Sequence, residues 1–239
     1  MWIERAVFTS SKTRHAEGYQ VVAKSPGVTN GIVTVLNRWC PSHAALQSID
    51  PHAQSLNFHP IDHERIAISR TTYGRKEFSR RGGLQVSTTV LIVQRQQLGG
   101  FENNAFVFAR TARSLGYLRW KPHFPEQLPA IEFPDNAAAD LRVEPNIDEA
   151  ASQFVESLRS GERLAIHWPH EPHELAGRLL KCLSPEERIR TFFTTGLKWS
   201  KQRPFSLHIF EAIEESTRLR LKTDDVRLIK PAIHELDSV

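Results

Sequence analysis

The stretch Glu64–Val93, ERIAISRTTYGRKEFSRRGGLQVSTTVLIV, decides the fold expected for the first half of this 239-residue chain. Its two ends, ERIAISRTTY and LQVSTTVLIV, are rich in the β-branched residues that favour strands. The middle, GRKEFSRRGG, supplies the glycines that a sharp reversal of the chain needs. We therefore predict two partner strands joined by a basic loop.

The basic loop is the most prominent surface feature that the sequence predicts. Its cations, Arg75, Lys76, Arg80 and Arg81, oppose only Glu77. One interpretation is a solvated hairpin end, because runs of charge usually face water. The other is a site where these four residues bind a partner protein or an anion, because the planar guanidinium holds carboxylate or phosphate through two parallel hydrogen bonds. No base-reading motif accompanies the loop, so sequence-specific nucleic-acid recognition is not expected.

The remainder of the first half indicates a strand-rich α+β unit over residues 1–115. Two further strands are expected in WIERAVFTS and YQVVAKS, followed by a turn at SPGV. Thr29 is placed to cap a helix that Pro41 ends. NNAFVFARTARSLG reads as a short helix closed by Gly116.

A proline-rich stretch separates the two halves. Pro122, Pro125, Pro129 and Pro134 remove amide donors and fix extended backbone, which predicts a linker over residues 116–145. The sign of the charge changes here as well. Residues 1–121 carry 16 Lys and Arg against 7 Asp and Glu, a net of +9, and the remaining residues carry 15 against 20, a net of −5.

The second half, residues 146–239, predicts a smaller unit of helices layered on a sheet. Asn146 should cap a helix, and RLAIHW alternates as a strand. Ser184, Pro185 and Glu187 match a capping box with proline at the first helical position. RTFFTTG, FSLHIFEA and RLRLK are further expected strands. The predicted class is therefore α+β, a strand-rich N-terminal unit followed by a smaller layered α/β unit.

Composition narrows the class of protein. Hydrophobic residues make up 40% and charged residues 24%, as in ordinary globular proteins, and no apolar run approaches the roughly 18 residues of a membrane span. Cys40 and Cys182 lack CxxC spacing, which favours a reducing cytoplasm and no disulfide; both are expected as buried small hydrophobes. The basic residues are not clustered densely enough for a dedicated nucleic-acid binder.

HWPHEPHELAG, residues 167–177, raises the question of a metal site or an active site. Pro172 is expected as the first helical residue, with Glu171 as its cap and His173 on an exposed first turn. Zinc needs three or four ligands converging at about 2 Å, and this spacing does not require such convergence. We therefore predict a strand-to-helix loop and no metal. His52, His59 and His63 are expected to be solvated or locally hydrogen-bonded.

Three segments resemble one known family. AVFTSSKTRHAEGYQVVAKSPGV resembles its two opening strands around a Ser/Thr- and Gly-containing loop that ends in Ser-Pro-Gly. SRRGGLQVSTTVLIV is similar to its Arg-Gly approach to a central strand, and LLKCLSPEERIRTFFTTG to its Leu-rich helix, Pro, Arg and Phe-Thr-Thr strand. The family is the N-terminal region of GTPase-associated adaptor proteins of bacterial NTPase-centred conflict systems. The resemblance would cover nearly the whole chain and implies an adaptor beside a GTPase, with no catalytic residues to carry over.

Two classes of function follow as expectations. The first is a non-catalytic cytoplasmic adaptor, without cofactor or membrane attachment, that binds a GTPase or other NTPase encoded nearby, or an effector. It agrees with the absence of GxxxxGK[ST], GxGxxG, GxSxG and HExxH. The alternative is a metal-dependent or hydrolytic enzyme that uses His167, His170, Glu171 and His173, or His59 and His63. A nonspecific nucleic-acid binder that uses the basic loop is a minor alternative.

Overall fold

The computed structural model describes residues 1–12, 17–77, 83–137 and 149–229. The strands are β1 Trp2–Lys12, β2 Glu17–Lys24, β3 Gln54–Pro60, β4 Arg65–Lys76, β5 Leu84–Gln94, β6 Ile131–Glu132, β7 Leu164–His167, β8 Phe193–Thr195, β9 Leu207–Phe210 and β10 Arg227–Ile229. The helices are α1 Asn30–Trp39, η1 Arg95–Phe101 (a 3-10 helix), α2 Ala105–Ser114, α3 Glu149–Arg159, α4 Pro172–Lys181, α5 Pro185–Arg188 and α6 Glu215–Thr223.

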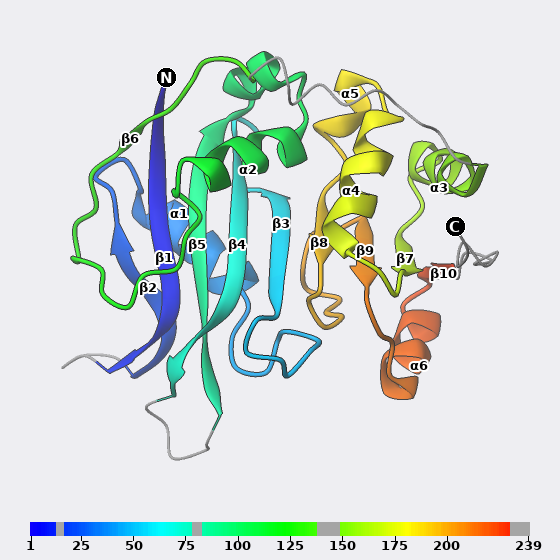
Figure 1. Ribbon diagram of the computed structural model, residues 1–239, viewed down its shortest axis with the longest axis horizontal. Helices are drawn as coiled ribbons and strands as arrows, with labels where there is room; N and C mark the ends of the chain where they lie inside the picture. Colours follow the sequence, from blue (N-terminus) through cyan, green and yellow to red (C-terminus); the bar gives the residue numbers. More distant parts are fainter. Residues whose placement is uncertain (13–16, 78–82, 138–148, 230–239) are drawn as a thin grey trace, which may run out of the picture.

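The strands form one mixed ten-stranded sheet within the described residues. Its order is β10-β7-β9-β8-β3-β4-β5-β1-β2, with β6 paired to β1. Strands β3, β4, β5, β1 and β2 are antiparallel, whereas β8, β9, β7 and β10 run parallel to one another. Figure 1 shows α2 and α4 in front of this sheet and α1 behind it. The predicted α+β class, with a smaller α/β region after a strand-rich part, is confirmed.

The two partner strands predicted from Glu64–Val93 are β4 and β5 at the middle of the first half. They pair in the antiparallel sense, with Ser69 opposite Val90. Alternation along β4 sends Ile66 and Ile68 into the core on the α2 side and Ala67 into the core under α1. Both faces are covered, so Ile66–Ser69 of β4 and Gln85–Val93 of β5 are buried, including their polar residues. Residues 78–82 of the connecting loop lie outside the described residues.

Both helices of the first half begin at a side-chain cap, and Thr29 is the cap predicted for the first of them. The hydroxyl of Thr29 accepts a hydrogen bond from the Ile32 amide at the start of α1. The side chain of Asn104 accepts from the amides of Phe106 and Val107 at the start of α2. Each helix therefore has at least one of its exposed amide donors satisfied, and each packs its apolar stripe on a different face of the sheet.

The second half layers helices on the parallel strands. Leu164 and Ile166 of β7 pack with α4 on one face, and Ala165 packs with Leu221 on the other. One expected strand is wrong: RLRLK lies within helix α6, where Leu221 is buried and Leu219 is 60% exposed. Two leucines two residues apart satisfy a strand pattern, but only one of them finds a core to enter.

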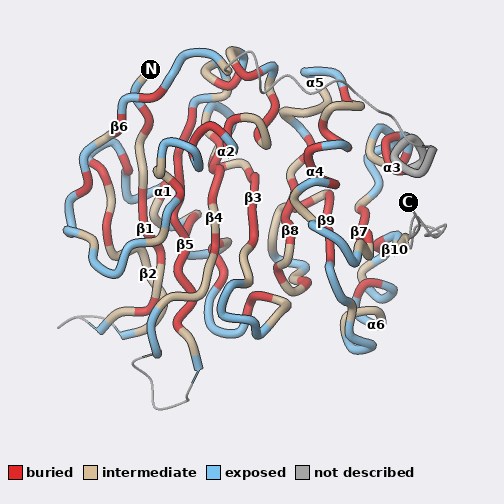
Figure 2. The backbone as a smooth tube through the Cα atoms, in the orientation of Figure 1, coloured by how far each residue is buried: buried red, intermediate tan, exposed pale blue. Residues whose placement is uncertain are grey.

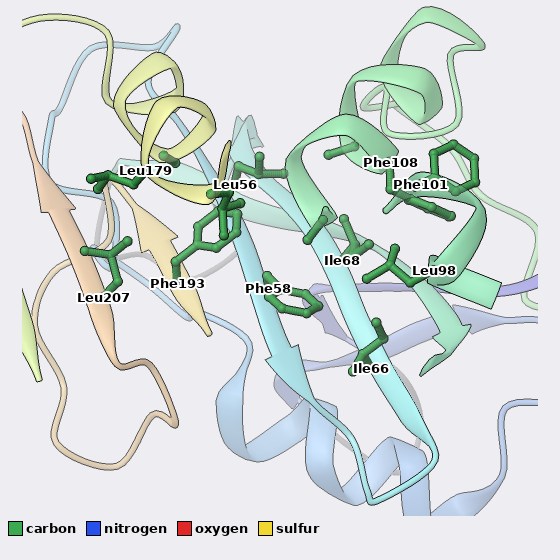
Figure 3. Close-up of a cluster of buried hydrophobic side chains, with 14 of the residues drawn as sticks. Leu56, Phe58, Ile66, Ile68, Leu98, Phe101, Phe108, Leu179, Phe193 and Leu207 are labelled. Carbon is green, nitrogen blue, oxygen red and sulfur yellow. The ribbon is translucent and has the colours of Figure 1, made fainter. Parts of the chain in front are cut away.

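The two predicted units share a continuous sheet at the β3–β8 junction. Strands β3 and β8 pair antiparallel, and the rings of Phe58 and Phe193 lie 6.0 Å apart across them. Figure 3 shows these two rings in one cluster with Leu56, Leu179 and Leu207. Figure 2 shows buried residues along β3, β4, β8 and β9, so the core continues through the junction.

The predicted linker folds back onto the first half as far as it is described. We call residues 117–137 the strap; in Figure 1 it is the green trace beside β1 and β2. The Leu128 amide donates to the Lys24 carbonyl at 2.9 Å, and Ile131 pairs with Ile3. The N-terminal ammonium of Met1 donates to the Phe133 carbonyl at 2.7 Å. Residues 138–148, including the predicted cap Asn146, lie outside the described residues.

Among the residues that the structure describes, no helix is both long and apolar enough to cross a membrane.

Candidate functional site

The end of β4 and the strap together form a basic surface. Arg75 and Lys76 are exposed at the end of β4, and Arg119, Lys121 and His123 are exposed on the strap. The guanidinium Nη2 of Arg75 lies 3.2 Å from Nδ1 of His123, so the two segments meet. We call these five residues the basic face. Arg80 and Arg81, predicted to act with Arg75 and Lys76, lie outside the described residues.

The basic face is not neutralised by nearby acids. Glu77 is the single carboxylate of the predicted loop, and its side chain is only 4% exposed. It turns toward His43, whose Nδ1 lies 2.8 Å from Glu77 Oε2. No member of the basic face has a carboxylate partner in the described part of the chain. The exposed field at this end of the sheet is therefore positive.

A cavity of about 440 Å³ extends this positive region beneath the strap. Its lining contains Arg5, Arg119, Lys121 and His123 and contains no Asp or Glu. Arg5 is held in place because its Nε donates to the Pro129 carbonyl at 2.9 Å. The sequence did not reveal the strap cations as part of a site. These cations join the basic surface because the strap passes close to β4 at Gly74. A Cβ added to Gly74 would lie 3.0 Å from Nε1 of Trp120.

The histidine stretch lies where β7 ends and α4 begins. Pro172 opens the helix and Glu171 is its N-cap, as predicted, but the Glu171 carboxylate makes no capping bond. Instead Glu171 Oε1 lies 2.5 Å from His173 Nδ1, and His173 Nε2 lies 3.4 Å from Thr195 Oγ1. The expectation that His173 is exposed is wrong. Its side chain is 13% exposed, because the first turn of α4 faces the end of β8.

Two opposing influences act on the pKa of His173. Burial lowers the pKa of His173, and the carboxylate of Glu171 opposes that shift. Thr195 itself is fully buried, and its hydroxyl accepts a hydrogen bond from the Leu56 amide at 2.9 Å. The hydroxyl is therefore occupied by a hydrogen bond within the chain and is closed off from solvent.

The other histidines are only partly gathered. A cavity of about 230 Å³ is lined by His52, His170 and His173, whereas His167 does not line it. In the described residues no group of three or more His, Cys, Asp or Glu side chains is arranged to hold a metal. His59 is buried and locally hydrogen-bonded, with Nδ1 3.0 Å from the Pro60 carbonyl. His63 is exposed.

The cysteines differ in burial. Cys40 is 7% exposed and packs under α1, as predicted for a small hydrophobe, and burial raises the pKa of its thiol to about 12. Such a thiol is protonated and inert at neutral pH. Cys182 is only partly buried at the end of α4, where its Sγ contacts the Arg178 carbonyl at 3.3 Å.

Comparison with known proteins places the first half of the chain in a family. A profile described as GTPase-associated protein 1, N-terminal domain type 2, matches residues 2–134. No curated protein and no solved structure matches the chain. The match contains the first two of the three segments that carried the resemblance and ends before Leu179–Gly196. It spans more than half of the sequence, and the chain therefore belongs to the family of the GTPase-associated protein 1 N-terminal domain, type 2.

Proposed function

We propose that this chain is a non-catalytic adaptor that binds a GTPase, or another NTPase or effector of a bacterial conflict system, through its basic face. The family description supports association with a GTPase. The observation that carries the proposal is the contact between Arg75 and His123, two basic groups 3.2 Å apart with the loop carboxylate turned away. A surface that gathers cations without neutralising them suits an acidic partner surface.

The non-catalytic part of the proposal rests on the histidine stretch. Both ring nitrogens of His173 face groups of the chain itself, Glu171 and Thr195. The Thr195 hydroxyl is buried and is not presented to a substrate, and the exposed Glu171 carboxylate is held against His173. The stretch accordingly serves to join α4 to the end of β8 rather than to carry out a reaction.

Charge reversal on the basic face tests the proposal. The measurement is the association rate between the purified chain and the NTPase encoded beside its gene, recorded over a range of salt. We expect Arg75→Glu/Lys76→Glu to slow association about tenfold or more at low salt, because exposed charges chiefly steer the encounter. The difference should shrink with added salt, since the screening length is already about 8 Å near physiological ionic strength. Arg80→Glu/Arg81→Glu should act in the same direction.

A matched control is available on the opposite part of the molecule. Arg220 and Lys222 are exposed on α6, and neither has an acidic partner among the described residues. Arg220→Glu/Lys222→Glu changes the net charge equally and should leave the association rate within about twofold of wild type. An unchanged rate for a folded Arg75→Glu/Lys76→Glu variant, or an equal loss in the control, would remove the basic face from the interface.

A further inference from the structure

A second cavity lies on the α2–α4 side of the β3–β8 junction. It has a volume of about 260 Å³, and its basic side chains are Arg70 of β4, Arg110 and Arg113 of α2, and His173 of α4. Leu56 and Phe106 contribute apolar walls. It adjoins the cavity of about 230 Å³ described above, because Gln54, Glu171 and His173 line both. Together they reach the size range of small-molecule sites, which begins at roughly 300 Å³.

The guanidinium groups in this cavity have no acidic partner among the residues that the structure describes. Arg70 is about half-buried, and its Nε donates to Gln54 Oε1 at 2.9 Å while its Nη1 donates to the Leu118 carbonyl at 3.2 Å. Both acceptors are neutral. Arg110 and Arg113 are exposed at the rim, and neither forms an ion pair within the described ranges. Arg70 and Arg113 line the same cavity, where burial lowers the pKa of Arg70 and the charge of Arg113 lowers it further.

The two carboxylates at the rim have other partners. Glu171 Oε1 contacts His173 Nδ1 at 2.5 Å. Glu174 Oε2 contacts Arg178 Nη2 at 3.9 Å, one turn further along α4. Like charges gathered in a partly dry site repel one another unless a counter-charge is supplied. The described part of the chain supplies none at ion-pair distance from Arg70, Arg110 or Arg113, so the cavity is preorganised for an anion.

We propose that this cavity binds a small molecule bearing a phosphate or carboxylate group, with the oxyanion between Arg70 and Arg113 and an apolar body against Leu56 and Phe106. Its position supports the proposal, because the cavity lies beside Thr195, the last residue of the parallel strand β8. Ligands of open α/β sheets bind outside the carboxyl ends of the parallel strands. The site draws residues from both halves of the chain, so it exists only when the β3–β8 junction is formed.

Calorimetric titration with three probes tests the proposal. Phenyl phosphate and benzoate share an aromatic ring and differ in the oxyanion, and inorganic phosphate lacks the ring. We expect saturable binding of at least one aromatic probe, with inorganic phosphate weaker than phenyl phosphate because it leaves the apolar walls uncovered. Which aromatic probe binds more tightly identifies the oxyanion as phosphate or carboxylate. Arg113→Gln should weaken that probe about tenfold, because a charge-assisted hydrogen bond is lost.

The control uses an arginine in the same position of another helix. Arg38 is exposed in the last turn of α1, just as Arg113 is exposed in the last turn of α2, and both helices have ten residues. Arg38→Gln should leave the affinity unchanged, and Arg113→Lys should retain part of it.

A second measurement is the pKa of His173 in wild type, followed by NMR. Binding of the probe should raise this pKa, because the negative charge of the probe offsets the positive charges of Arg70 and Arg113, which lower it. Absence of saturable binding up to ~10 mM probe, or equal loss in Arg38→Gln, would overturn the proposal.

Discussion

His208 on β9 is buried among aromatic rings. Its side chain is 1% exposed and lies 4.5 Å from the Trp199 ring and 5.7 Å from the Phe210 ring, measured between centroids. Neither ring nitrogen has a hydrogen-bond partner among the described residues. Burial, followed by the charges of Arg163 and Arg203, holds the pKa of His208 well below its ordinary value. Protonating this ring in the folded chain would place an unpaired charge in the core.

His59 on β3 responds to pH in the same way. Burial lowers its pKa from 6.5 to about 4. The unfolded chain exposes both histidines, so it binds protons below pH 6.5 that the folded chain does not bind. The contribution to stability is therefore complete above about pH 6.5 and declines as the pH falls toward 4, by about 3 kcal/mol for His59 alone.

At the residue scale we predict that His208→Phe makes stability less dependent on pH. Phenylalanine keeps an aromatic ring of similar shape and cannot bind a proton. Urea midpoints at pH 7 and pH 4.5 should differ less for His208→Phe than for wild type. His63→Gln is the control, because His63 is 88% exposed and should leave the difference unchanged. Equal pH dependence in His208→Phe and wild type would show that His208 is not a buried neutral group.

At the scale of elements, η1 is fitted closely to the strap. A Cβ added to Gly100 would overlap the carbonyl oxygen of Asp135, and the Ala137 amide donates to the Gly100 carbonyl at 3.2 Å. The neighbouring Gly99 has open space, with nothing within 4 Å of an added Cβ. Two adjacent glycines in one short helix therefore differ in a single respect, the approach of the strap.

We predict that Gly100→Ala destabilises the chain and Gly99→Ala does not. The cost for Gly100→Ala should be about 1–3 kcal/mol, the range for forcing an extra group into a packed contact, because backbone must move. Gly99→Ala should change stability by less than about 0.5 kcal/mol. The free energy of unfolding in urea measures both. A Gly100→Ala midpoint equal to that of Gly99→Ala would mean that the strap does not dock at η1.

Elements with local signals could be predicted from the sequence. Ser184 accepts a hydrogen bond from the Glu187 amide at 3.3 Å, and Glu187 accepts one from the Ser184 amide at 2.7 Å, which confirms the predicted capping box. The two residues of this capping box are three positions apart, so the sequence alone is enough to recognise it. RLRLK has no comparable signal, because its two leucines are two residues apart, a spacing that favours a strand over a helix. Only the surrounding packing, which buries Leu221, decides between them.

The candidate sites depend on contacts between distant segments, and this limited their prediction. Arg75 and Lys76 can be predicted as binding residues because the basic residues of the loop are clustered in the sequence. The partner of Arg75, His123, is 48 positions away, and the burial of His173 follows from a junction in which Thr195 meets Leu56 across 139 positions. Arg70 lies within an expected strand, and nothing local in the sequence indicates that residues of α2 and α4 share a cavity with it.

At the scale of the whole molecule, the charge is divided unevenly over one continuous sheet. Residues 1–121 carry a net charge of +9 and the remainder −5. The basic face lies at the end of β4 and on the strap, whereas α6 lies at the opposite end of the sheet, beside β10 (Figure 1). The proposed acidic partner would therefore be directed to the first half, the part of the chain that matches the GTPase-associated family.

Hydrogen exchange of the complex tests this account most directly. The chain is bound to the NTPase encoded beside its gene, and amide exchange is compared with that of the chain alone. If the partner binds the basic face, exchange slows at residues 72–77 of β4 and 119–123 of the strap, and α6 is unchanged. Protection confined to residues 149–229, with the basic face exchanging as in the unbound chain, would contradict it.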